Sequence, residues 1–200
     1  MLTAGCHAEW TESAHVKIAS DRSNFGGVTG LTQAESNYAF LVGCYALCKG
    51  RVEIEPKNGT DYTANAGGIA GTLANSTIAG CTVKAKNIYG HNASSPSLIG
   101  VSGIAAYVVG VSSVSDCKAY ATLIRNSTVL GTEDASVTPD NLFGMGMIVG
   151  IDAGTTTVTN CGVGGSFYLG ASEKPQELIL TLDADSYAKG IIGSGKTATV

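Results

Sequence analysis

The chain has 200 residues and a mass of 20.2 kDa, which suits one domain with a sizeable core. Its hydrophobic fraction of 44% excludes disorder as the default state, and no apolar run reaches the roughly 20 residues that a membrane-spanning helix needs. The formal net charge of -4 argues against nucleic-acid binding, because binding requires cations that neutralise phosphates.

The first recurring segment has a cysteine near its centre. Its copies are Leu2–Ala8, Phe40–Ala46, Thr77–Val83, Ser113–Ala119 and Thr157–Val163. Apolar residues stand three positions before and two positions after the cysteine, as Ile78 and Val83 do around Cys81. Strict strand alternation would place Ile78 and Cys81 on opposite faces, so both face inward only if the chain bends between them.

The residue just before each cysteine is of a type that tolerates a left-handed backbone, and these residues are Gly5, Gly43, Gly80, Asp116 and Asn160. Each copy is therefore predicted to be a strand, a one-residue corner with positive φ and a second strand. After the corner of the third copy, Cys81, Val83 and Ala85 are predicted to face inward, with Thr82, Lys84 and Lys86 facing outward.

Two further segments follow the corner in each repeat. The first is a short apolar stretch, represented by Val16 and Ile18, Val52 and Ile54, Ile88, Leu123 and Ile124, and Phe167 and Leu169. The second is glycine-rich, and its copies are Gly26–Gly30, Gly67–Gly71, Ser102–Ala106, Gly146–Gly150 and Lys189–Gly193. Its central column of Val28, Ile69, Ile104, Ile148 and Ile191 is predicted to form an interior ladder.

Three short strands in a repeat of about 40 residues, stacked in register, predict an all-β fold. The architecture expected is a parallel β-solenoid of about five coils with three short strands per coil. Helical repeats are disfavoured, because glycine and β-branched residues occupy the positions that helix formers should hold. Residues 1–200 are expected to form a single β-solenoid domain.

The residues Gly67-Gly68-Ile69-Ala70-Gly71, followed ten positions later by Cys81-Thr82-Val83, resemble the GLUG repeat. That repeat occurs in large bacterial cell-surface and secreted proteins. The resemblance covers nearly the whole chain and implies an extracellular, right-handed parallel β-helix without catalytic residues. The third glycine-rich copy departs from the family pattern, with Ser102 and Ala106 in place of glycine.

Two motifs could carry chemistry, and each has a structural interpretation. Gly190–Thr197 matches the Walker A pattern, but only three residues follow it, which is too few for the helix that a phosphate site needs. Five of the six cysteines share one repeat position and are predicted to be buried free thiols, with Cys48 out of register. No C-x-x-C spacing is present, so no metal or other cofactor is expected.

Acid–base residues show no recognisable catalytic spacing. The histidines are His7, His15 and His91; the carboxylates considered are Glu53 and Glu55 on one strand face, and Asp61, Asp152, Asp183 and Asp185 in unrelated columns. No catalytic site is therefore predicted, and an outward charged strand face is the expected role of Glu53 and Glu55.

Two functional hypotheses follow. The first is a non-catalytic structural or adhesive segment of an extracellular bacterial protein. The second is a carbohydrate-active β-helix that binds or cleaves glycans, which exposed tyrosines gathered on one outer face would favour; the candidates are Tyr45, Tyr62, Tyr107, Tyr120 and Tyr168. No capping pattern is visible at either end, so we expect either a segment of a longer repeat array or a unit that stacks end to end on copies of itself.

Overall fold

The computed structural model describes residues 1–20, 22–34, 39–56, 62–92, 97–127, 143–170, 176–178 and 192–195. All of the regular structure in these ranges is β-strand, arranged in four sheets that we name A to D. Within the same ranges there is no helix of the length and apolarity that crossing a membrane requires.

Sheets A and B carry the corner segments. Sheet A consists of β1 (Leu2–Ala4), β6 (Ala39–Val42), β10 (Ser76–Ala79), β14 (Val111–Ser115) and β18 (Thr155–Thr159). Sheet B consists of β2 (His7–Trp10), β3 (His15–Ser20), β7 (Tyr45–Pro56), β11 (Thr82–Asn92), β15 (Lys118–Ser127), β19 (Gly162–Gly170) and β20 (Gln176–Leu178).

Sheets C and D flank the glycine-rich segments. Sheet C consists of β4 (Arg22–Gly26), β8 (Tyr62–Gly67), β12 (Ser97–Ser102) and β16 (Phe143–Gly146). Sheet D consists of β5 (Thr29–Gln33), β9 (Ala70–Ala74), β13 (Ala105–Val109), β17 (Val149–Asp152) and β21 (Ile192–Gly195).

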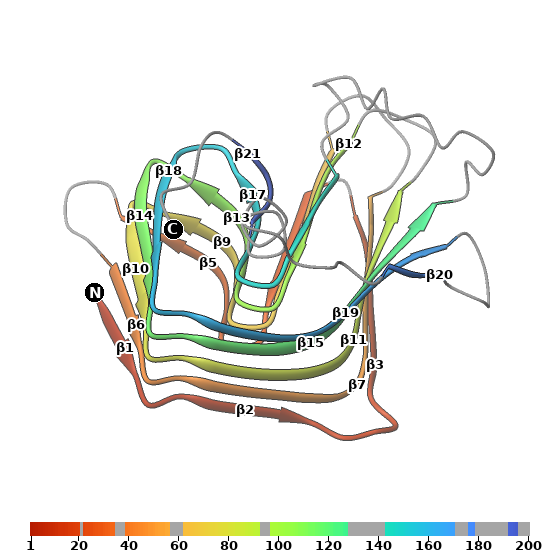
Figure 1. The fold of residues 1–200 in the computed structure, drawn as a ribbon, viewed down its shortest axis with the longest axis horizontal. Helices are drawn as coiled ribbons and strands as arrows, with labels where there is room; N and C mark the ends of the chain where they lie inside the picture. Colours follow the sequence, from red (N-terminus) through yellow and green to blue (C-terminus); the bar gives the residue numbers. More distant parts are fainter. Residues whose placement is uncertain are drawn as a thin grey trace.

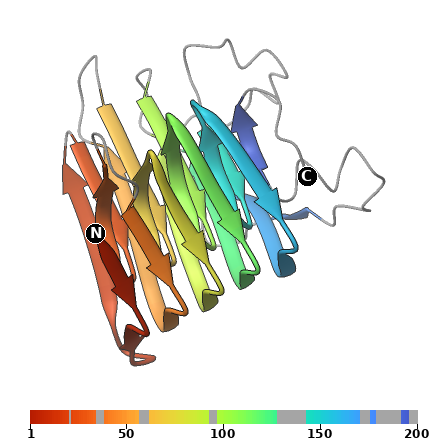
Figure 2. The same ribbon diagram turned by 90° about the vertical axis from the view of Figure 1, so that its left-hand side faces the viewer.

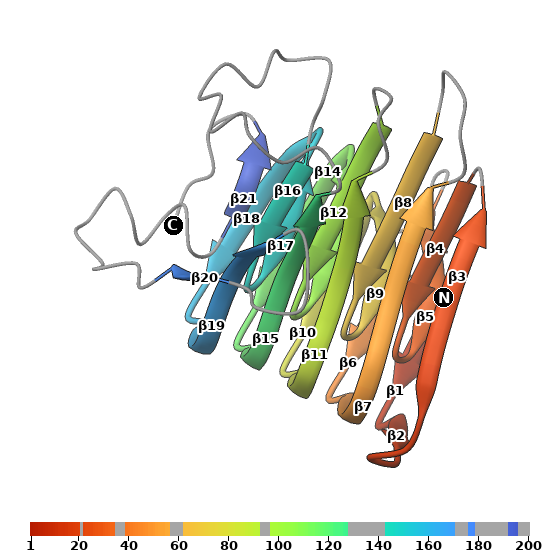
Figure 3. The same cartoon turned by 90° about the vertical axis from the view of Figure 1, so that its right-hand side faces the viewer.

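The chain visits the sheets in the same order in each repeat. It runs along sheet A, turns into the long strands of sheet B, returns through sheet C, reverses into sheet D and then enters sheet A of the next repeat (Figure 1). Corresponding strands of successive repeats lie side by side in sequence order, as Figure 2 shows for sheet A and Figure 3 for sheets B and C. The strand pairs are parallel, apart from β20, which pairs antiparallel with β19.

The number of strands per repeat differs from the prediction of three. The strand after the corner and the apolar stretch that follows it form one long strand in β7, β11, β15 and β19, and a register shift between Ala85 and Ile88 marks their junction. Two further strands, in sheets C and D, lie on either side of the glycine-rich segment. Alternation of side chains does not separate two strands from one strand with a bulge, which is why the sequence pattern divides the repeat differently.

The corners are those predicted. Gly5, Gly43, Gly80, Asp116 and Asn160 all have positive φ, between 52° and 63°. Their amides also continue the ladder between repeats: the N–H of Gly43 donates to Ala79 O at 2.9 Å, and that of Gly80 donates to Ser115 O at 2.9 Å. The corners at Gly5, Gly43, Gly80 and Asp116 therefore turn the chain with their own N–H groups paired to the next repeat.

The interior ladder is confirmed where the structure describes it. Ile69, Ile104 and Ile148 are fully buried, and Val28 packs against the same core while remaining partly exposed; Ile191 lies outside the described residues. Inward side chains of all four sheets belong to one hydrophobic cluster, for example Leu41 from β6 and Leu73 from β9. Each large apolar side chain buried there contributes roughly 1.5–3 kcal/mol.

Glycine at the reversal between sheets C and D has a steric cause. A Cβ atom on Gly68 would overlap the carbonyl oxygen of Gly103 and lie 2.5 Å from Val83 Cγ1. The backbone of one repeat thus packs directly on the next repeat and on the sheet B side chain beneath it. The Gly-Gly pair marks this close approach.

Candidate functional site

The cysteine column forms a ladder of free thiols at the entry to sheet B. Strand pairing aligns Cys6, Cys44, Cys81, Cys117 and Cys161, because the residue that follows each cysteine pairs with its counterpart in the next repeat. The backbone N–H of Cys44 donates to the Sγ of Cys81 at 3.3 Å, and that of Cys81 donates to the Sγ of Cys117 at 3.4 Å. The thiol is thus the acceptor for an amide that the corner turns inward.

The thiols differ in acidity. Burial raises the pKa of Cys44 and of Cys48. Hydrogen bonds with the thiols of Cys161 and Cys81 raise the pKa of Cys117, and the same contacts lower the pKa of Cys81 and of Cys161 to about 7. In the described ranges, no group of three or more His, Cys, Asp or Glu side chains is placed to hold a metal ion.

Glu53 lies in a compact polar cluster on the second half of sheet B. Its carboxylate contacts His15 Nε2 at 3.2 Å and pairs with Arg51, whose guanidinium lies 4.0 Å from the ring centroid of Tyr89. Glu53 is 4% exposed, although its neighbours on β7 alternate inward on either side of it. The outward direction of Glu53 agrees with the sequence prediction, whereas its burial under these side chains does not follow from alternation.

The remaining acid–base candidates are dispersed. Glu55 pairs with Lys17 at 3.0 Å. Asp152 is buried at the end of β17, where its Oδ1 accepts hydrogen bonds from Gly154 N at 3.0 Å and Thr156 Oγ1 at 2.8 Å. Asp61, Asp183 and Asp185 lie outside the described residues, and the side chain of His91 is not described. Glu53 and Asp152 belong to different sheets.

The Walker-like motif is partly described. Ile192–Gly195 forms strand β21, in which Ile192 pairs with Val149 of β17. This segment therefore continues the repeat register that the sequence pattern indicated, while Lys196 and Thr197 lie outside the described residues.

A positively charged surface, opposite in sign to the net charge of the chain, covers the first half of the sheet B strands. The basic face, as we call it, is made of the outward lysine and tyrosine side chains Tyr45, Lys49, Lys84, Lys86, Lys118 and Tyr120, with Leu47 and Thr82 between them and His7 and Glu9 at its β2 edge. The strand register brings these residues together, since Thr82 pairs with both Tyr45 and Lys118.

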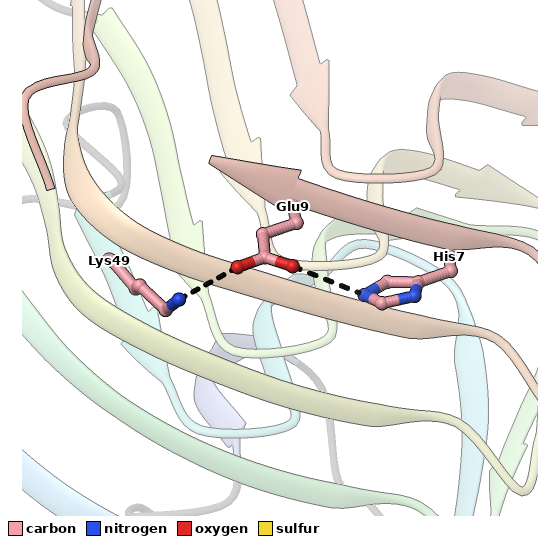
Figure 4. Close-up of polar contacts among 3 residues, drawn as sticks. All are labelled: His7, Glu9 and Lys49. Atoms are coloured by element: carbon pink, nitrogen blue, oxygen red, sulfur yellow. Dashed lines mark hydrogen bonds and ion pairs between the residues drawn. The ribbon is translucent and has the colours of Figure 1, made fainter. Parts of the chain in front are cut away.

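Glu9 neutralises one end of the basic face. Its carboxylate accepts a hydrogen bond from Lys49 Nζ at 2.7 Å and lies 3.9 Å from His7 Nε2 (Figure 4). The Lys49 ammonium lowers the pKa of Glu9, and the carboxylate raises the pKa of Lys49. No described carboxylate pairs with Lys84, Lys86 or Lys118.

Two of the tyrosines singled out in the sequence lie on the basic face. Tyr120 is 47% exposed, and Tyr45 is half-buried with its ring 5.1 Å from the His7 ring, centroid to centroid. Tyr107 lies on sheet D, and the side chains of Tyr62 and Tyr168 are not described. The outward direction of Lys84 and Lys86 was predicted, but that of Lys49 and Lys118 was missed. The signal was available: the cysteine faces inward, so residues an odd number of positions after it on the same strand face outward.

Comparisons of the chain with protein-family models, with curated proteins and with solved structures find no match.

Proposed function

We propose that the protein is a non-catalytic, right-handed β-solenoid of about five coils that serves as a structural or adhesive segment of an extracellular bacterial protein. The GLUG-like repeat supports the surface or secreted location. The repeated order of sheets A to D, the in-register parallel pairing and the single shared core support the solenoid. Right-handed winding is the sense that parallel crossover connections favour, and the views in Figures 1 and 2 agree with it.

One observation carries the structural part of this proposal: among the described strands, those of the first repeat lie at one end of every sheet. β1, β4 and β5 are edge strands of their sheets, and β2 and β3 pair only with β7 among the described strands. Apolar side chains of the same repeat, such as Trp10 and Phe25, are only partly buried against the core. Open parallel edges are able to pair with further strands, so we propose that another copy of the chain stacks here.

Light scattering across a concentration series tests the stacking. We expect the mean mass to rise with protein concentration, because head-to-tail contacts do not close into a ring. Hydrogen exchange should show protection of the β1–β5 amides that increases with the mean mass. A species that stays monomeric at every concentration, with these amides already protected, would contradict the proposal.

A second role is favoured by the placement of Tyr45 and Tyr120 on the same outer face. Exposed aromatic rings on a flat sheet are suited to contact sugar rings, so we propose glycan binding as the adhesive activity. Cleavage of a glycosidic bond would need a pair of carboxyl groups flanking that bond, and the basic face carries Glu9 as its single described carboxylate. Binding without cleavage is therefore the form of this proposal.

A further inference from the structure

We infer that the basic face binds a linear acidic polysaccharide, with lysine ammonium groups contacting its carboxylates or sulfates and the Tyr120 ring contacting a sugar ring. The inference rests on the glycan-binding role proposed above and specifies the chemical class of the glycan.

The sign of the charge is the first argument. The whole chain has a formal net charge of -4, yet the basic face presents four lysines against one glutamate. Lys84, Lys86 and Lys118 are exposed and have no carboxylate partner among the described residues. Such an isolated positive surface complements an anion and repels cationic partners.

The spacing is the second argument. Lys84 pairs directly with Tyr120 on the neighbouring strand. Two residues earlier on the same two strands, Thr82 pairs with Lys118. Neighbouring strands are about 4.8 Å apart, and outward residues two positions apart on one strand are separated by roughly 6.6 Å. Lys118, Lys84 and Lys49 thus step diagonally across three neighbouring strands, since Lys84 pairs with Leu47 and Lys49 lies two positions beyond Leu47. A polymer that crosses the strands obliquely therefore meets one lysine in each of three successive repeats.

The setting of Tyr120 is the third argument. A Cβ atom on Gly164 would lie 2.9 Å from Tyr120 Cδ1 and 3.2 Å from Cε1, so the ring lies across the glycine backbone of β19. One side of the ring is thus supported by the sheet, and the side chain remains 47% exposed. A supported, open aromatic face next to lysines suits a sugar that bears an acidic group.

A nucleic acid fits the surface less well. Tight binding of nucleic acid usually involves about 6–10 phosphate contacts, and the negative charge of the rest of the chain opposes a polymer of that charge density. The basic face has four lysines, which is fewer than this number of phosphate contacts. The supported ring of Tyr120 beside them favours a sugar instead.

Titration calorimetry with defined polymers tests the inference. The probes are polygalacturonate, dextran sulfate, uncharged dextran and a thymidine oligonucleotide. We expect saturable binding of polygalacturonate or dextran sulfate that weakens as salt rises from about 50 to 200 mM, because released counterions drive the association. Dextran should not bind, and the oligonucleotide should bind more weakly than the acidic polysaccharide.

Variants then assign the binding to the basic face. Lys84→Gln together with Lys86→Gln and Lys118→Gln should lower the affinity by about tenfold or more and flatten its salt dependence. Tyr120→Ala should lower the affinity while leaving the salt dependence unchanged. Lys17→Gln is the matched control for the single change Lys84→Gln, and it should leave the affinity unchanged. Lys17 lies on the other half of sheet B, where it pairs with Glu55. Melting curves establish that each variant remains folded.

The inference is overturned if neither acidic polysaccharide binds saturably at low salt, if the triple variant binds as tightly as the parent, or if dextran or the oligonucleotide binds more tightly. Binding of uncharged dextran alone would leave the glycan-binding role in place and remove only the acidic specificity. The concentration series on stacking is independent of all these measurements, so a failure here is distinguishable from a failure of the structural proposal.

Discussion

At the scale of single residues, cysteine recurs at one position because its thiol is small, apolar and able to accept a hydrogen bond. The corners at Gly43 and Gly80 direct the following amide inward, and the next thiol accepts it: Cys81 Sγ accepts from Cys44 N–H, and Cys117 Sγ accepts from Cys81 N–H. Cys81 Sγ in turn lies 3.5 Å from Ala79 O. Alanine would fill the space only in part and would accept no hydrogen bond.

We expect Cys81→Ala to destabilise the protein by about 1–3 kcal/mol more than Cys48→Ala does. Both changes remove a buried thiol, but only the first removes the acceptor of a backbone N–H, since Cys48 Sγ donates to the carbonyl of Gly50 and accepts no hydrogen bond from a described residue. Urea denaturation followed by circular dichroism gives the two free energies of unfolding. Equal losses of stability in the two variants would show that the thiol acts through its volume alone.

At the scale of elements, the reversal between sheets C and D depends on direct backbone contact between repeats. We expect Gly68→Ala to destabilise the protein by about 1–3 kcal/mol, because its Cβ would overlap Gly103 O and press on Val83. The same change at Gly162 is the control: there the Cβ would meet only Lys118 Cγ, at 3.7 Å. Gly162→Ala should therefore shift stability by no more than about 0.5 kcal/mol. Thermal melting curves compare the stabilities of the two variants. If Gly68→Ala is as stable as Gly162→Ala, the repeats are not in direct backbone contact at the reversal.

At the scale of the whole molecule, the end-to-end stacking proposed above requires that the inward column remain apolar from one repeat to the next. Thr3 occupies the register position of Leu41 on edge strand β1, whereas Leu2 points outward and is 68% exposed. We expect Thr3→Lys to abolish the rise of mass with concentration, because an inward charge at an edge opposes further pairing. Leu2→Lys, one residue away, should leave the rise in place. If Leu2→Lys instead prevents association, the contact runs through the outer face of sheet A.

Local chemistry explains why so much of the repeat could be predicted. Strict alternation of inward and outward side chains fails just before each cysteine, which predicts a corner at Gly80, Asp116 and Asn160. The residue types at these positions tolerate positive φ by themselves. Burial of Ile69 and Ile104 likewise follows from a column that stays apolar in each copy. A second set of corners escaped prediction: Asn75 and Gly110 have φ of 48° and 68°. The Asn75 side chain holds that corner by bonding Ala34 O and Val111 N of neighbouring repeats, which are not close to it in sequence.

The sequence by itself therefore determined the repeat, its cysteine corners and its interior columns, because these depend on side-chain polarity and backbone sterics within a few residues. Only the tertiary structure decided that each repeat uses four sheets, because bulges and reversals depend on what the neighbouring repeat permits. The same holds for the basic face. Lys49, Lys84 and Lys118 belong to three different repeats, and the in-register pairing of parallel strands alone brings their charges onto one surface.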